Sequence, residues 1–217
     1  MSVGEEDILV IESAIRGGSI ALLRNGMTVA HYVGNSDVSR SEELLPNIAQ
    51  LLKSAGLEKS DLNRIVVSRG PGSFTGLRIG LATAMGLAES LGIGVDGVSL
   101  LDALFLQGDE EAAKLVAVPV GRNDVAWQTS EKGRGLRSAA RSERADLFVE
   151  RVWVERDIQL ILHSHLLPML SAVSVASMRI VDAGENLASV IGSAWLSGKL
   201  ASSGLEPIYL ANSAYRA

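Results

Sequence analysis

The residues best placed to do chemistry lie in one glycine-rich stretch, Ser68 to Gly80, which reads SRGPGSFTGLRIG. Glycines adopt positive φ angles at little cost, so such a loop can bring backbone amides and a hydroxyl group close to a bound anion. The loop lacks the lysine of a phosphate-binding P-loop, and its spacing differs from that of a dinucleotide fingerprint. The alternative is a structural corner, in which Ser73 or Thr75 caps the helix that follows.

Other reactive side chains are sparse. The histidines are His31, His163 and His165, and the last two are two positions apart, which does not place them on one helical face. We therefore predict no metal site. Ser73 lacks the Gly-x-Ser-x-Gly elbow of a serine nucleophile. The chain contains no cysteine, which excludes disulfides, thiolate metal ligands and a cysteine nucleophile.

The elements around the loop are a strand and a helix. The apolar run 65–67 predicts a strand before the loop, and a helical pattern continues after it to about Leu91. Gly76, Gly80 and Ala84 recur at every fourth position of this helix, although an interior glycine costs ~1 kcal/mol relative to alanine. Close packing must compensate for that cost. The helix can pack against its own sheet, against another subunit, or against both on different faces.

The rest of the first half is predicted to add further strands and helices to the same lobe. Residues 1–34 are expected to form a three-stranded antiparallel meander, with a hairpin turn at Asn25 and Gly26. An amphipathic helix is predicted over 39–56, a strand over 93–98 and a helix over 99–107.

We place a boundary between two lobes, residues 1–107 and 108–217. For the second lobe the predicted elements are strands over 115–120, 124–129, 147–154 and 178–181, and helices over 160–175 and 186–200. This half looks like a smaller, degenerate echo of the first.

Composition narrows the class of protein. The 217 residues are 47% hydrophobic and 21% charged, as in ordinary globular proteins. A formal net charge of -5 argues against a broadly basic nucleic-acid surface. The dense basic stretch 132–144 is either a solvated loop or a contact for tRNA or a partner. We predict no membrane segment and a cytoplasmic location, because the chain shows neither a secretory signal pattern nor an apolar run of ~20 residues.

The run GPGSFTGLRIG (70–80), the helix with Leu44, Leu45 and Pro46, and the segment Glu206 to Leu210 together resemble the bacterial TsaB (YeaZ) family. The resemblance is carried mainly by residues 8–105. It implies an α/β protein with the two-lobed actin-like ATPase (ASKHA, ribonuclease H-like) fold and a reduced second lobe. A carboxylate ending the first strand before a hairpin, here Glu12, is how nucleotide-binding lobes of that superfamily begin.

The resemblance also implies a function. Members are non-catalytic subunits that pair with the paralogue TsaD and, with the ATPase TsaE, support transfer of a threonylcarbamoyl group to the adenosine beside the anticodon of tRNA. The chain would thus be an accessory subunit that meets tRNA indirectly, through the complex. Apart from the resemblance, a face that stays apolar when its partner is missing is a candidate homodimer site. Mapped onto this sequence, the expected interface residues are Leu44, Ile48, Leu51, Leu52, Gly76, Gly80, Ala84 and Met85.

Departures from the family pattern leave alternatives open. Glu12 replaces an aspartate, Arg40 precedes Ser41 where a histidine is common, and a second-lobe motif is altered around Pro119 to Arg122. No cofactor is expected to be required. Weak binding of ATP or ADP with magnesium would use Glu12, Gly70, Gly72, Ser73 and Thr75. The alternatives are a nucleotide-dependent ATPase or kinase of the same superfamily and a metalloprotease, for which the sequence offers no ligand motif.

Overall fold

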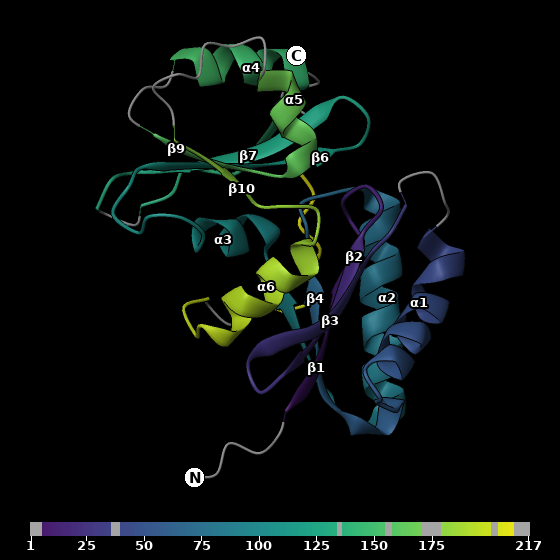
Figure 1. The fold of residues 1–217 in the computed structure, drawn as a ribbon. Helices are drawn as coiled ribbons and strands as arrows, with labels where there is room; N and C mark the ends of the chain where they lie inside the picture. Colours follow the sequence, from purple (N-terminus) through teal and green to yellow (C-terminus); the bar gives the residue numbers. More distant parts are fainter. Residues whose placement is uncertain are drawn as a thin grey trace.

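The computed structural model describes residues 6–35, 40–133, 136–154, 158–170, 179–200 and 204–210, without the side chains of 40–42 and 153–154. Two five-stranded mixed sheets dominate it (Figure 1). The first sheet has the order β3-β2-β1-β4-β5. Its strands are β1 (Asp7–Glu12), β2 (Ser19–Arg24), β3 (Met27–Val33), β4 (Leu62–Ser68) and β5 (Gly94–Val98).

The second sheet repeats this topology. Its strands are β6 (Lys114–Val120), β7 (Asp124–Ser130), β8 (Arg141–Arg144), β9 (Gln159–Leu162) and β10 (Arg179–Asp182), in the order β10-β9-β6-β7-β8. In both sheets the first three strands form an antiparallel meander and the last two add in parallel beside the first. The echo of the first half in the second, expected from the sequence, is therefore confirmed at the level of strand order.

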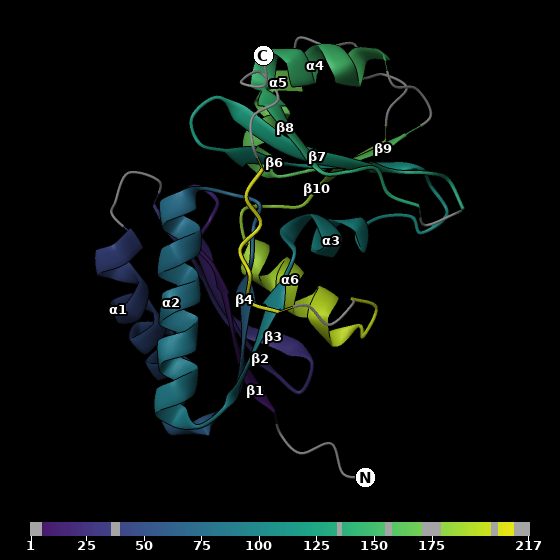
Figure 2. The ribbon, with the colours of Figure 1, turned by 180° about the vertical axis from the view of Figure 1, so that it is seen from behind.

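Helices form three layers around the sheets (Figures 1 and 2). On the outer side of the first sheet lie α1 (Arg40–Ser54) and α2 (Phe74–Leu91), and the short η1 (Lys59–Asp61) precedes β4. On the outer side of the second lie α4 (Ala145–Val154), η2 (Ser164–Leu166) and α5 (Leu167–Leu170). Between the sheets lie α3 (Leu100–Phe105) and α6 (Leu187–Leu196).

Each of the two middle helices packs against the sheet that it does not follow in the sequence. Helix α3 follows the first sheet and contacts β6 of the second, while α6 follows the second sheet and contacts β1, β2 and β4 of the first. One apolar cluster consequently joins both sheets and both helices. The break between the sheets falls between residues 98 and 114, but the chain crosses back over it at α6.

Alternation along the strands explains why both faces of each sheet are covered. On β1, Ile8 and Val10 join the cluster between the sheets, whereas Leu9 and Ile11 pack under α1 and α2. Such strands, buried on both faces, are typical of sheets with helices on both sides.

Two predictions for the second half are wrong. Residues 147–154 form part of α4 rather than a strand, because Phe148 and Val152, four positions apart, are buried on one helical face. The helix predicted over 160–175 begins as β9, whose residues are all buried between β6 and β10. Its last part, 171–175, lies outside the described residues. The other predicted strands and helices are found within a few residues of their expected limits.

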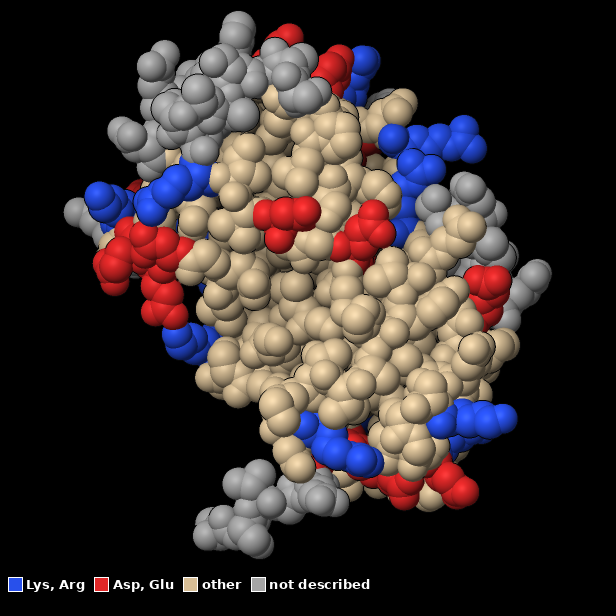
Figure 3. Space-filling model, viewed as in Figure 1, with Lys and Arg blue, Asp and Glu red and all other residues tan. Residues whose placement is uncertain are grey.

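The face of the molecule shown in Figure 3 carries no continuous basic field, since its lysines and arginines lie around the margins, interspersed with acidic residues. In the described part of the chain, no helix combines the length and the apolar character that crossing a bilayer requires.

Candidate functional site

The glycine-rich loop forms a tight corner between β4 and α2. Gly70 has φ 91°, and its carbonyl oxygen accepts a hydrogen bond of 2.8 Å from the amide of Leu100. The Ser73 hydroxyl accepts a 3.0 Å bond from the amide of Gly76 and so caps α2. The expectation that Ser73 is a capping residue is confirmed.

This corner packs directly against the turn between β1 and β2. The Ser73 amide donates to the Ala14 carbonyl oxygen at 2.8 Å, and the Ser13 hydroxyl donates to the Gly76 carbonyl oxygen at 2.8 Å. A Cβ atom added at Gly72 would lie within 3.0 Å of Ala14, and one added at Gly80 within 3.0 Å of the Ser13 hydroxyl oxygen. The glycines therefore allow two backbone segments to approach closely.

The Glu12 carboxylate takes part in the same corner. Glu12 is 1% exposed, and its Oε1 accepts hydrogen bonds from the amides of Ala14 at 2.6 Å and Ile15 at 3.0 Å. Those amides belong to the turn that follows β1, so the carboxylate caps its own turn. Of the remaining residues considered for nucleotide binding, Gly70 is buried, Gly72 and Ser73 are half-buried and Thr75 is exposed.

The residues predicted for a subunit interface divide into two groups. Buried inside this chain are Ile48, Leu51, Leu52, Gly76, Gly80 and Ala84. Leu44 is half-buried, and Met85 is 50% exposed. The small-residue spacing of Gly76, Gly80 and Ala84 thus faces the protein's own sheet and turn, and among the eight only Met85 lies on the exposed surface.

A neighbouring set of small and apolar residues does reach the surface of the two helices. It comprises Leu45 and Ala49 of α1 and Ala82, Met85 and Gly86 of α2, and we call it the outer helix face. Helices α1 and α2 run side by side on the outside of the first sheet (Figures 1 and 2). The sequence analysis did not identify this face, and the signal that could have indicated it is the spacing of four between Leu45 and Ala49 and between Ala82 and Gly86.

The segment Gly204 to Leu210 closes the corner from outside. The Ile208 amide donates to the Arg69 carbonyl oxygen at 2.7 Å, and the Arg69 side chain donates to the Glu206 carbonyl oxygen at 3.0 Å. The Phe74 ring, 51% exposed, lies 5.1 Å from the Tyr209 ring, and the Arg78 guanidinium stacks on Phe74 at 3.8 Å. Two of the three sequence segments that carry the family resemblance, 70–80 and 206–210, are therefore in contact.

Three arginines of the basic stretch 132–144 contact other side chains of this chain. Arg137 pairs with Asp102 and lies over the Phe105 ring, Arg141 lies over the Trp127 ring, and Arg144 pairs with Asp146 at 2.8 Å. Residue 134 lies outside the described part of the chain.

Two histidines stack at the end of β9. The rings of His163 and His165 are 5.0 Å apart, and the His163 Nδ1 accepts a hydrogen bond from the His165 amide. Burial, with a smaller contribution from the nearby His165, lowers the pKa of His163 from 6.5 to about 4. Within the described residues, no group of three or more histidine, aspartate or glutamate side chains is arranged to hold a metal ion.

The lowered pKa of the buried His163 predicts that the folded protein loses stability as the pH falls. The unfolded chain takes up this proton near pH 6.5 and the folded chain only near pH 4, so that stability is lost as the pH falls between those values. Between pH 7 and pH 4.5 the free energy of unfolding should fall by about 2 kcal/mol less in His163→Asn than in the parent protein. Asparagine keeps a hydrogen-bond acceptor at this position. Urea unfolding of both proteins at the two pH values measures the difference. Identical pH dependence would contradict the assignment.

Sequence comparison finds relatives for about half of this chain. The family model for TsaD, tRNA N6-adenosine threonylcarbamoyltransferase, matches residues 36–154. The tRNA threonylcarbamoyladenosine biosynthesis protein TsaB of Bacillus subtilis is 39% identical over 101 residues, which are 46% of this chain and 44% of that protein. The chain spans about half the length of the curated relatives it matches.

Solved structures are similar over nearly the whole chain. YeaZ from Pseudomonas aeruginosa has a TM-score of 0.64 at 24% identity and covers 94% of this chain and 100% of its own. A Bacteroides thetaiotaomicron protein with an actin-like ATPase fold has a TM-score of 0.51 at 12% identity, over 89% of this chain and 96% of its own. The expected two-lobed actin-like ATPase fold is confirmed.

Proposed function

Because this chain belongs to the TsaB/YeaZ family, we propose that it serves tRNA threonylcarbamoyladenosine biosynthesis as an accessory subunit that performs no catalysis itself. In this role it pairs with a TsaD-type paralogue, works with a TsaE-type ATPase and meets tRNA through the complex. The paralogue carries out threonylcarbamoyl transfer to the adenosine beside the anticodon.

The outer helix face is the observation that carries this proposal. Exposed apolar residues on two neighbouring helices indicate a candidate surface for contact with another protein. Ala82 and Gly86 present almost no side chain, so a partner helix can approach α2 closely, and Leu45 and Met85 supply apolar area beside them. A two-helix face of this kind suits a partner that presents two helices of its own, as a paralogue of the same fold does. In the absence of that partner, a second copy of this chain is the natural occupant.

The structural role of the Glu12 carboxylate in the corner supports the proposal that this chain performs no catalysis. A carboxylate that coordinates a magnesium nucleotide has to present its oxygens to the ligand, whereas Oε1 of Glu12 accepts two backbone amides of its own turn. We propose that the chain needs no nucleotide for its function. The ATPase or kinase alternative requires tight, magnesium-dependent ATP binding, which calorimetry detects. Glu12→Gln is the variant of choice, because an amide oxygen can still accept the two backbone bonds.

Reconstitution tests the proposal. The purified chain is combined with a TsaD-type protein, a TsaE-type ATPase, the threonylcarbamoyl-adenylate donor and unmodified tRNA. We expect co-elution with the TsaD-type protein and modified adenosine only when the chain is present. Modification that proceeds equally without the chain, or a chain that neither binds the paralogue nor restores modification, would overturn the proposal.

A further inference from the structure

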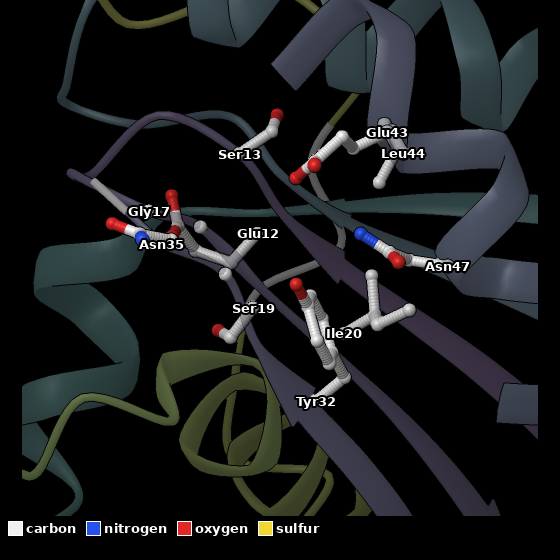
Figure 4. Close-up of a pocket in the computed structure, with 12 residues that line it drawn as sticks. Glu12, Ser13, Gly17, Ser19, Ile20, Tyr32, Asn35, Glu43, Leu44 and Asn47 are labelled. Carbon is white, nitrogen blue, oxygen red and sulfur yellow. The ribbon is translucent and has the colours of Figure 1, made fainter. Parts of the chain in front are cut away.

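A pocket lies between the β1–β2 turn, the start of β2, the end of β3 and the side of α1 that contacts β3 (Figure 4). The cavity volume is about 30 Å³, which is room for a small head group, and the pocket is otherwise open to solvent. The residues that line it are Glu12, Ser13, Gly17, Gly18, Ser19, Ile20, Tyr32, Gly34, Asn35, Glu43, Leu44 and Asn47. Neither the corner nor the outer helix face accounts for this pocket.

Backbone contacts shape one wall of the pocket. The Gly34 amide donates to the Gly18 carbonyl oxygen at 3.0 Å, and a Cβ atom at Gly34 would lie within 3.0 Å of the Gly17 carbonyl oxygen. These glycines hold the turn against the end of β3. Ile20 and Leu44 contribute apolar surface. The cavity is therefore preformed and partly apolar, as small-ligand sites usually are.

Three polar side chains point into the same space from two elements. The Glu43 carboxylate and the Asn47 amide come from successive turns of α1, and the Tyr32 hydroxyl reaches toward them from β3 (Figure 4). Within the described part of the chain, none of these three side chains has a hydrogen bond or an ion pair. Polar groups that converge on a cavity without partners can bind a ligand without breaking existing bonds.

The charge of the lining restricts the kind of ligand. It contains two carboxylates and, among the described residues, no lysine, arginine or histidine. An anion is therefore disfavoured. A divalent metal ion prefers several carboxylate ligands, whereas Oε1 of Glu12 is held by its own turn. An organic cation is complementary to this lining. Its charge can pair with Glu43 and contact the Tyr32 ring, and its alkyl part can contact Ile20 and Leu44.

We propose that this pocket binds an organic cation through an alkylammonium or guanidinium group, with Glu43 as the charge partner and Asn47 and Tyr32 as hydrogen-bonding groups. The same group is offered by a free small amine and by a lysine or arginine side chain of a docked protein. The proposal goes beyond the accessory role in tRNA modification and does not depend on it.

NMR titration of the isolated, ¹⁵N-labelled chain with n-butylammonium chloride and ethylguanidinium chloride tests the site. We expect saturable shifts of the Asn47 side-chain amide and of the amides of Gly17, Gly18 and Gly34. Glu43→Gln, which removes the charge and keeps the volume, should weaken binding at least tenfold. The matched control is Glu89→Gln on the exposed side of α2, which should leave the dissociation constant unchanged.

Three results would overturn the proposal: shifts that do not saturate, equal binding by Glu43→Gln, or equally tight binding of uncharged 1-butanol. An unaltered spectrum away from the pocket verifies that each variant is folded. If the cation binds, repeating the titration in the complex with the TsaD-type protein separates the two sources. Loss of the signal there identifies a partner side chain as the occupant, and its persistence identifies a free amine.

Discussion

Replacing Gly80 by leucine is expected to lower the free energy of unfolding by about 3 kcal/mol or more. Even a methyl group at this position would collide with the Ser13 hydroxyl oxygen, and that hydroxyl is held by its hydrogen bond to the Gly76 carbonyl oxygen. The turn after β1 and helix α2 would have to separate, which would disturb the buried cap made by Glu12. Chemical denaturation of the purified variant measures the loss.

The same substitution at Gly86 is the matched control. Gly86 lies on the exposed side of the same helix, and a Cβ atom there would meet nothing within 4 Å. Since leucine is a better helix former than glycine, Gly86→Leu should raise stability by roughly 0.5 to 1 kcal/mol. Equal effects at the two positions would contradict the packing described for α2. A partial recovery of Gly80→Ala by Ser13→Ala would locate the collision at the hydroxyl group.

The second large effect concerns the outer helix face. Replacing Met85 by glutamate is expected to weaken binding of the TsaD-type paralogue by about 100-fold, because a charge would be buried at the centre of an apolar contact. The fold should be unaffected, since the Met85 side chain is 50% exposed in the free chain. Calorimetry with the paralogue measures the affinity, and thermal unfolding of the free variant checks the fold.

Leu147→Glu is the control for surface charge. Leu147 is 46% exposed on α4, on the far side of the second sheet, so this variant should bind the paralogue like the parent. If Met85→Glu bound normally, the outer helix face would not be the contact surface. If both variants lost binding, the effect would be one of charge rather than of position.

The sequence could predict the local structure of the first half because its signals there are local. The turn at Asn25 and Gly26 has φ angles of 50° and 80°, the combination for which this residue pair is selected. The cap at Ser73 depends on a residue three positions away. In the second half, apolar runs at 147–154 and 160–162 carried no such signal. A short buried run is compatible with helix and strand alike until its neighbours are known.

What the amino-acid sequence by itself determined is the alternation of strands and helices in the first half, the family resemblance and the need for close packing at Gly76, Gly80 and Ala84. Only the tertiary structure decided what those residues pack against. The β1–β2 turn, more than sixty positions earlier, fills the space that the glycines leave. The contact surface that we propose therefore lies on exposed residues of the helices, among them Ala82, Met85 and Gly86. The exchange of α3 and α6 between the sheets and the pocket around Glu43 also depend on contacts between distant segments. Such contacts leave no periodic pattern in one sequence. An apolar residue indicates that its position is buried, but it does not indicate which segment covers it.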